Sequence, residues 1–321
     1  VWAGTDDGRL HITRDDGANW KEITPPGLPE YATVDRIDLS VHQPGRALVA
    51  AQKYRFDDFA PYVFLTNDYG KTWKKITKGI PDNYPVRSVC EDPERKGLLF
   101  AGTEFGVFVS FDDGNNWQSL QLNLPITPVT DLRVHQQDLV LSTQGRSFWI
   151  LDDITPLHQI TPEVAKANVH LFEPRLAYRV NAAGSGGMSG NEVPERKPQG
   201  ATIYFKKMGE ADSELTMTIV DKEGRIVRRY SSDEKNAKKY KTPVLPKGSG
   251  MHRVNWDLTY EGPTFVEGTV IWGYSGGVKA PPGIYEVRLT YKGETQTQSL
   301  ELKGDPRLPE IPAEDYEEQL R

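Results

Sequence analysis

The first half of the chain repeats one order of short apolar segments. Alternating segments begin at Val34, Val86 and Val129, and a period of two residues predicts a half-buried β-strand. Two further apolar segments follow each of them, separated by a polar corner, and the last ends at a hydroxyl residue in two copies, Thr66 and Ser110. A tight turn then leads to a fourth short segment. We therefore expect antiparallel units of four strands, A to D in chain order.

The turn between strands C and D carries a motif that occurs three times, and we call these segments the repeat turns. They read TRDDGANW from Thr13, TNDYGKTW from Thr66 and SFDDGNNW from Ser110. Glycine supplies the positive φ of a tight turn, aspartate accepts N–H groups, and tryptophan supplies apolar area between sheets. Because the same carboxylate occurs once per unit, we interpret these residues as structural and not catalytic. They are Asp15, Gly17, Trp20, Asp68, Gly70, Trp73, Asp112, Gly114 and Trp117.

The spacing of the repeat turns is that of propeller blades. Their tryptophans lie 53 and 44 residues apart, and four short antiparallel strands at this period are typical of a β-propeller. The first copy lacks a strand A, and a degenerate fourth unit, LSTQGRSFWILDD, begins at Leu141. Since propellers commonly have about four to eight blades, we expect residues 1–157 to form three to four blades of a larger ring. Upstream blades or another chain would complete it.

The second half predicts a different β-fold. Short strand candidates recur between residues 199 and 304, and APPGIYEVRLTY from Ala280 resembles the late strands of fibronectin-like modules. We expect an immunoglobulin- or fibronectin-like β-sandwich there, with Trp256 in its core. Residues 158–198 would be a connecting segment with a Gly-rich linker, and residues 305–321 the start of an acidic helical tail. The predicted fold class is all-β.

Charge and composition argue against several classes of partner. The net charge is −6 with acidic and basic residues interspersed, so we expect no nucleic-acid partner. No apolar run approaches the roughly 20 residues that span a bilayer. The histidines show no metal-ligand spacing, and the single cysteine, Cys90 in SVCED, excludes an internal disulfide and indicates a small buried strand residue. We expect no metal and no cofactor.

The repeat turns resemble the Asp-box of BNR repeats, which is found in sialidases, xyloglucan-hydrolysing propellers and sortilin-like receptors. The segments KYRFDDFAPYVFLTNDYGKTW, GTEFGVFVSFDDGNNW and TQGRSFWILDDITPL resemble large bacterial proteins labelled sortilin-like or glycosyl-hydrolase-like. This resemblance implies further propeller blades, then an immunoglobulin-like domain and a helical tail. We expect an extracytoplasmic location (secreted, periplasmic or cell surface), although this sequence shows no signal peptide.

Function in such a fold is expected on the loops between strands B and C, on the face opposite the repeat turns. These loops are TDDG from Thr5, QKYRFDDFAPY from Gln52, TEFG from Thr103 and TQGR from Thr143. Carboxylates, arginines and aromatic rings suit both glycan and peptide recognition. The candidate ligand-binding residues are Tyr54, Arg55, Asp57, Asp58, Phe59, Glu104, Phe105 and Arg146. We expect the long second loop to cover this face, with Asp57 or Asp58 within reach of Glu104 or Arg146.

Two functions remain open at this point. A glycoside hydrolase needs two carboxylates flanking the glycosidic bond, and Asp57 or Asp58 would have to pair with Glu104. Sialidase chemistry needs an arginine cluster, and the arginines here do not repeat at equivalent positions. No GxSxG motif supports a serine hydrolase. We therefore favour a binding or scaffold role, with a protein or a glycan as ligand, over catalysis.

Overall fold

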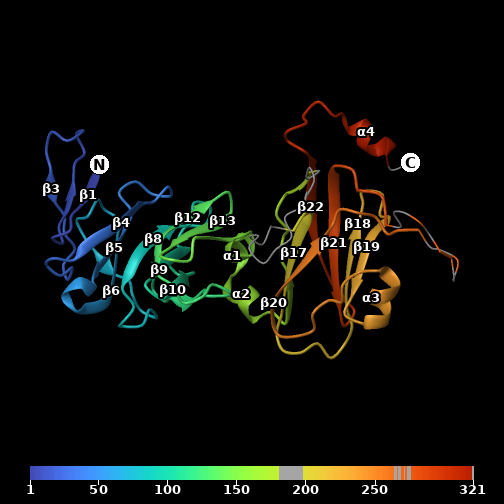
Figure 1. Ribbon diagram of the computed structural model, residues 1–321, viewed down its shortest axis with the longest axis horizontal. Coiled ribbons are helices and arrows are strands. Elements are labelled where there is room, and N and C mark those ends of the chain that lie inside the picture. The colour runs from blue at the N-terminus through green and yellow to red at the C-terminus, as the bar shows by residue number, and fades with distance from the viewer. Residues whose placement is uncertain (181–197, 264–265, 267–268, 271, 273–275, 320–321) are drawn as a thin grey trace. The chain divides into compact units, whose positions relative to one another are not determined.

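The computed structural model contains two compact units, Val1–Ile154 and Thr155–Arg321 (Figure 1). It describes the chain except for residues 181–197, 264–265, 267–268, 271, 273–275 and 320–321. The predicted Gly-rich linker, from Asn181, therefore lies outside the described residues apart from its last residue. In the described part, none of the helices is both long and apolar enough to cross a membrane.

The first unit is a series of four antiparallel sheets, in which each strand pairs with its neighbours in the sequence. Blade 1 contains β1 (Trp2–Gly4), β2 (Leu10–Ile12) and β3 (Lys21–Glu22). Blade 2 contains β4 (Thr33–Leu39), β5 (Ala47–Lys53), the short 3-10 helix η1 (Tyr54–Phe56), β6 (Asp58–Thr66) and β7 (Lys74–Lys75). Blade 3 contains β8 (Val86–Glu91), β9 (Leu99–Thr103), β10 (Gly106–Ser110) and β11 (Gln118–Ser119). Blade 4 contains β12 (Val129–His135), β13 (Asp138–Thr143) and β14 (Phe148–Leu151).

The blades pack face to face, and this arrangement is propeller-like. One apolar cluster joins blades 1 and 2 through residues such as Ile23 and Phe64, and a second joins blades 2 and 3 through Ile76 and Trp117. All five residues of β9 and all five of β10 are buried, because both faces of this sheet are covered. The sequence prediction for Cys90 is confirmed, since it lies buried on β8.

The repeat turns form nearly the same hydrogen bonds. In the third turn, Ser110 Oγ donates to Asp112 Oδ1 over 2.9 Å and accepts the N–H of Gly114 over 2.9 Å. Asp112 also accepts the main-chain N–H of Asn116 at 2.8 Å and its side-chain amide at 2.6 Å. The turns that begin at Thr13 and Thr66 repeat this scheme. The aspartates therefore satisfy the polar groups of tight turns.

The tryptophans of the repeat turns connect neighbouring blades. The indole N–H of Trp73 donates to the carbonyl of Ile23 over 2.8 Å, and that of Trp117 donates to the carbonyl of Ile76 over 2.7 Å. Each tryptophan thus reaches the residue that follows strand D of the preceding blade. Trp20 has no preceding blade among the described residues, and 48% of it is exposed.

The structure corrects the prediction of a long B–C loop in blade 2. Strand β5 continues to Lys53 and β6 begins at Asp58, so these two residues pair and only Tyr54–Asp57 remains between the strands. The alternating burial of Asp58 to Ala60 continues the strand, and a register irregularity between Ala51 and Lys53 accommodates it. The segment is an extended hairpin and not a ten-residue excursion.

The second unit contains two sheets that share one core. The strand orders are β15-β17-β20 and β16-β22-β21-β18-β19. The strands are β15 (Val169–Leu171), β16 (Ala177–Arg179), β17 (Ala201–Lys207), β18 (Leu215–Val220), β19 (Ile226–Ser231), β20 (Gly250–Trp256), β21 (Gly283–Tyr291) and β22 (Glu294–Gly304). Trp256 is fully buried in this core, as expected, and its ring lies 5.2 Å from that of Tyr285 in an edge-to-face arrangement.

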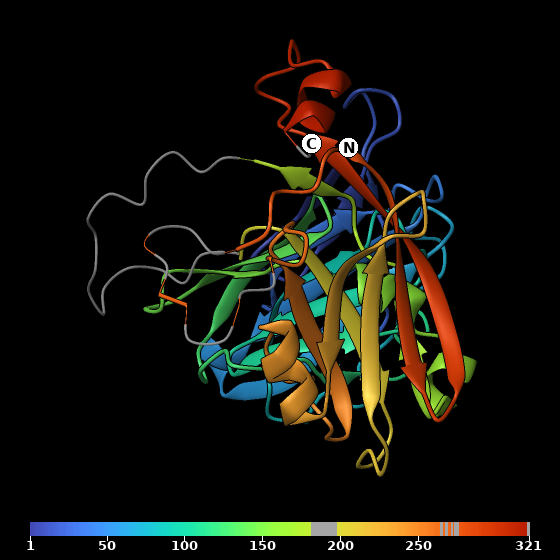
Figure 2. The same cartoon turned by 90° about the vertical axis from the view of Figure 1, so that its right-hand side faces the viewer.

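The segment 158–198, expected as a connection, contributes to both sheets. Strand β15 pairs antiparallel with β17, and β16 pairs parallel with β22. Both strands are three residues long, too short for a visible alternation. The helices are α1 (Thr155–Gln159), α2 (Pro162–Lys166), α3 (Glu234–Tyr240), which lies beside β19, and α4 (Ala313–Glu318) in the acidic tail (Figure 2).

Candidate functional site

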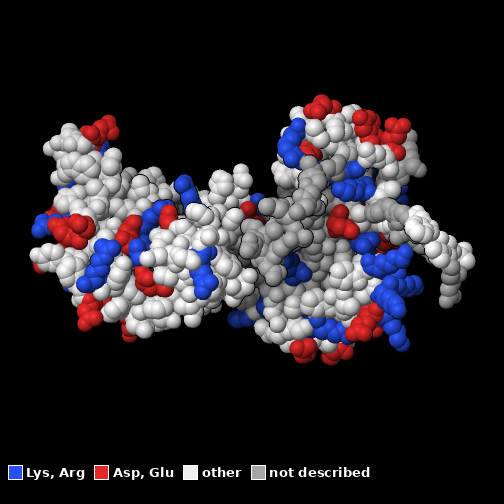
Figure 3. All heavy atoms as spheres, in the orientation of Figure 1, with Lys and Arg blue, Asp and Glu red and all other residues white. Residues whose placement is uncertain are grey.

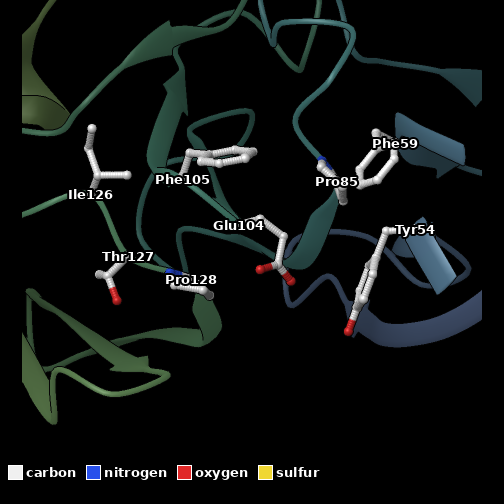
Figure 4. Close-up of a pocket in the computed structure, with 8 residues that line it drawn as sticks. All are labelled: Tyr54, Phe59, Pro85, Glu104, Phe105, Ile126, Thr127 and Pro128. Atoms are coloured by element: carbon white, nitrogen blue, oxygen red, sulfur yellow. The ribbon is translucent and has the colours of Figure 1, made fainter. Parts of the chain in front are cut away.

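A pocket of about 370 Å³ lies on the first unit, where connections from blades 2, 3 and 4 meet (Figure 4). It lies opposite the repeat turns along the strands, since its residues follow strand B or precede strand A. Its walls are mostly aromatic rings and prolines, and Glu104 lies at the centre of the labelled side chains. The lining residues are Tyr54, Phe59, Pro85, Glu104, Phe105, Ile126, Thr127 and Pro128.

Glu104 is held by an arginine from the innermost strand of its own blade. Arg87, on β8, donates from Nη1 to Glu104 Oε1 over 2.7 Å and from Nε to Asp35 Oδ2 over 2.7 Å. The three side chains are 18 to 21% exposed. Two carboxylates thus flank one guanidinium beside the pocket, partly shielded from water, and the charge of Arg55 also acts on Asp35.

Burial and ion pairing have opposite effects on the pKa values of Asp35 and Arg87. Burial raises the pKa of Asp35, and the charge of Arg87 offsets this only in part. Burial works to lower the pKa of Arg87, but the hydrogen bond to Glu104 and the charge of Asp35 outweigh it, so that this pKa is raised. Arg87 is therefore a fixed cation that orients Glu104.

Local backbone geometry positions the two residues of blade 3. The main-chain N–H of Glu104 donates to the carbonyl of Pro85 over 3.0 Å, which ties the B–C turn to the preceding connection. Thr103 Oγ1 accepts the N–H of Phe105 over 3.1 Å. The ring of Phe105 lies 4.5 Å from that of Tyr84, so the exposed aromatic is supported from behind.

Half of the predicted binding residues meet in this pocket. Tyr54, Phe59, Glu104 and Phe105 line it. The remaining four are Arg55, Asp57, Asp58 and Arg146, and none of them is among the lining residues.

Asp57 and Asp58 have local roles in the structure. Asp58 accepts the hydroxyl of Tyr62 over 2.7 Å, and Asp57 ends η1 in a left-handed conformation with φ of 61°. The expectation that one of them comes within reach of Glu104 or Arg146 stays a prediction.

The residues of the D–A connections were not among those predicted for the site. Pro85, Ile126, Thr127 and Pro128 come from the segments that lead into β8 and β12, and Arg87 from β8 itself. The signal was present, because B–C and D–A connections open on the same face of a blade. The prolines in YPVRS and PITPV mark rigid loops at that edge.

One face of the first unit carries charges of both signs. On the face shown in Figure 3, acidic and basic side chains are interspersed over this unit, so this face presents no extended basic surface of the kind that nucleic-acid binding requires.

Comparison with known proteins gives similarity at low identity. No family model and no curated protein matches the chain. YCF48 bound to D1 peptide is 19% identical over 47% of this chain and 47% of that chain, with a TM-score of 0.37. YCF48 from Cyanidioschyzon merolae is 16% identical over 48% and 49%, with a TM-score of 0.35. A GH74 xyloglucanase from Xanthomonas campestris is 11% identical over 93% and 43%, with a TM-score of 0.38. The matched part spans less than half of each solved chain.

Proposed function

We propose that the first unit is a binding module that recognises an apolar segment of a protein ligand in the pocket formed by blades 2, 3 and 4. The observation that carries this proposal is the lining, in which three aromatic rings and two prolines surround a single charged side chain, Glu104. Concave, mostly apolar sites with few polar groups are typical of ligand recognition. Phe59 and Phe105 are 46% and 38% exposed, which makes them available as anchors.

The carboxylate of Glu104 gives the pocket its polarity. Arg87 engages Oε1, and Oε2 has no hydrogen-bond partner in the described part of the chain. Oε2 can accept an N–H from an extended peptide or pair with a lysine or arginine of the ligand. This oxygen therefore favours a ligand that is apolar and carries such a donor.

The alternative reading is a glycoside hydrolase that uses paired carboxylates. It would require a second carboxylate facing Glu104 across the pocket. Glu104 is the only carboxylate among the lining residues, and Asp35 lies behind Arg87. This geometry favours binding over hydrolysis, with a glycan ligand as the other outcome that the experiment can return.

Peptide and glycan arrays probed with the 321-residue chain test the proposal. We expect peptide ligands whose affinity falls at least tenfold, or about 1.4 kcal/mol, in Phe105→Ala and in Glu104→Gln. Phe56→Ala is the matched control, because Phe56 is an exposed aromatic of η1 that does not line the pocket. Ligands that are only glycans would contradict the proposal. Hydrolysis of a polysaccharide that disappears in Glu104→Gln would establish the enzyme instead.

We also propose that a further sheet packs against blade 1 and extends the ring. A Cβ at Gly70 or Gly114 would collide with Ile23 or Ile76 of the preceding blade, whereas a Cβ at Gly17 would meet only Trp20, at 3.9 Å. The first repeat turn therefore resembles the other two, but in the described residues no isoleucine of a preceding blade packs against its glycine. Fluorescence quenching tests this: Trp20 should be protected in the complete assembly, and free access of iodide to Trp20 there would refute it.

A further inference from the structure

Blade 4 differs from blades 2 and 3 at its outer edge. In those blades a two-residue strand, β7 or β11, pairs with strand C. In blade 4, β14 occupies the position of strand C, and in the strand pairing of the described residues it pairs with β13 alone. The hydroxyl that organises the repeat turn is replaced by Leu151, and the chain continues into α1.

In the other blades a tryptophan directly precedes this strand, and blade 3 retains the carbonyl that would accept the indole N–H of the missing one. Ile23, Ile76 and Leu120 each follow strand D and donate their N–H to a carbonyl of strand C, over 2.8, 2.9 and 2.9 Å. The first two accept the indole N–H of Trp73 and Trp117. Leu120 is the third member of this series, and no repeat turn follows blade 3 to supply its tryptophan.

An apolar cleft lies at the position of that tryptophan. It is formed between the end of blade 3 and the sheet of blade 4, so its location matches that of Trp117 between blades 2 and 3. Its residues are Val107, Leu120, Gln121, Leu122, Asn123, Leu124, Leu139, Leu141, Trp149, Ile150 and Leu151. None of them lines the pocket around Glu104. Leu122 and Ile150 are 68% and 57% exposed, so the cleft opens onto an apolar surface.

The register of blade 4 shows which main-chain groups of β14 face outward. Val107 accepts the N–H of Leu120, so the main chain of Val107 and Val109 faces strand D in blade 3. Ala101 pairs with Phe108 between strands B and C of blade 3, and Leu141 pairs with Trp149 in the same way in blade 4. The two pairs correspond, because Ala101 and Leu141 also pair with the equivalent residue of strand A, which lies just after a register irregularity in both blades. Phe148 and Ile150 therefore occupy the positions of Val107 and Val109, with their N–H and C=O groups directed to the outer edge.

We propose that the outer edge of β14 and the cleft beside Leu120 form a docking site for an extended segment of another protein. This segment adds to blade 4 as its fourth strand and packs a tryptophan side chain onto the cleft, which has a volume of about 50 Å³ and opens to the surface. Main-chain bonds to the edge strand supply affinity, as in other strand-addition complexes, and the cleft supplies selectivity. The carbonyls of Leu120 and Leu122 take the roles that those of Ile76 and Lys78 have toward Trp117.

The chain itself supplies the probe. A peptide with the sequence of residues 110–122, SFDDGNNWQSLQL, contains a repeat turn, its tryptophan and a strand D. We expect the fluorescently labelled peptide to bind the 321-residue chain in a polarisation assay, and its Trp117→Ala version to bind at least tenfold more weakly. Failure of the tryptophan peptide to bind, or equal binding of both peptides, would overturn the proposal.

Variants of the protein locate the site. Ile150→Lys places a charge on the exposed edge strand, and we expect it to weaken binding of the tryptophan peptide at least tenfold. Ile226→Lys is the matched control, because Ile226 lies on β19, the outer strand of its sheet, and is 46% exposed. It should bind like the parent. Circular dichroism checks that both variants are folded, and full binding by a folded Ile150→Lys protein would place the peptide elsewhere.

Discussion

Carboxylates in the first unit occupy two contrasting environments. Those of the repeat turns are exposed or half-buried and accept several hydrogen bonds, which lower the pKa of Asp15 and of Asp68 to about 2; the side chains of Asn19 and Thr72 contribute most. On the innermost strand of blade 2, burial raises the pKa of Asp35 and Asp38 instead. Aspartate thus accepts the hydrogen bonds of a tight turn in one place and is a partly buried carboxylate in the other.

The first prediction at this scale concerns the repeat turn of blade 3. Asp112→Ala removes the acceptor of three donors, which are the hydroxyl of Ser110 and the main-chain and side-chain N–H groups of Asn116. We expect a loss of about 1–2 kcal/mol in the free energy of unfolding, measured by urea denaturation. Asp82→Ala is the control, because Asp82 is exposed in a connection. Ligand binding should persist in the folded variant. A variant as stable as the parent that has lost binding would mean that Asp112 belongs to a functional site.

At the scale of elements, the contact between blades has one recurring form. An indole from one turn reaches the end of strand D in the preceding blade, and an isoleucine fills the space beside the turn glycine. Arg46 adds a polar contact of the same kind, since it pairs with Glu91 and Asp113 of the next blade and is 2% exposed. Breaking one partner of such a buried group costs more than the pair contributes, because a charge is left without compensation.

Two tryptophans in equivalent turns provide the second prediction. Trp117 is 5% exposed and bonded to Ile76, whereas Trp20 is 48% exposed. Trp117→Ala should therefore cost about 3–5 kcal/mol in the free energy of unfolding, and Trp20→Ala less than about 1 kcal/mol. Urea denaturation of the 321-residue chain measures both. Equal losses would show that Trp20 is packed and that blade 1 does not end in an open contact.

The sequence predicted the structure where a local pattern repeats, and failed to predict it where the structure depends on contacts between distant residues. The turn motif predicted strands C and D of three blades, because its glycine and hydroxyl act within a few residues. The extended hairpin of blade 2 was missed, because the polar and aromatic segment QKYRFDDFAPY has the composition of a loop. Only the pairing of Lys53 with Asp58 shows that the strands continue into it. Likewise, half of the site was found from the B–C turns, but the role of Arg87 depends on neighbours 52 and 17 residues away.

At the scale of the whole molecule, two units with separate cores share one chain. The first buries its apolar residues between consecutive blades, and the second between two sheets. The proposed recognition site lies at the edge where the connections between strands meet, and the repeat turns lie at the opposite edge. We therefore expect substitutions at different residues to alter ligand binding and stability. The identity of the ligand, the size of the ring and the extracytoplasmic location stay predictions.

The repeat turns act together in the response of the molecule to acid. A carboxyl whose pKa is lower in the folded chain than in the unfolded chain stabilises the fold above its unfolded value, and this contribution is lost as the pH falls through the folded value. For Asp15 and Asp68 the window runs from the ordinary 3.8 down to about 2, and the pKa of Asp112 is lowered in the same direction, as hydrogen bonds from Asn116 outweigh burial. Asp35 acts in the opposite sense, because its pKa is raised.

We therefore expect the thermal midpoint of the chain to fall between pH 4 and pH 2, and a triple variant with asparagine in place of the three repeat-turn aspartates to lose part of this slope. The control is a second triple variant with asparagine at three exposed aspartates, Asp6, Asp57 and Asp82, which changes the net charge equally. It should keep the slope of the parent, because those residues lie outside the repeat turns. Identical slopes in both triple variants would show that the acid response arises elsewhere, and that the hydrogen bonds of the repeat turns contribute little to the stability of the folded molecule.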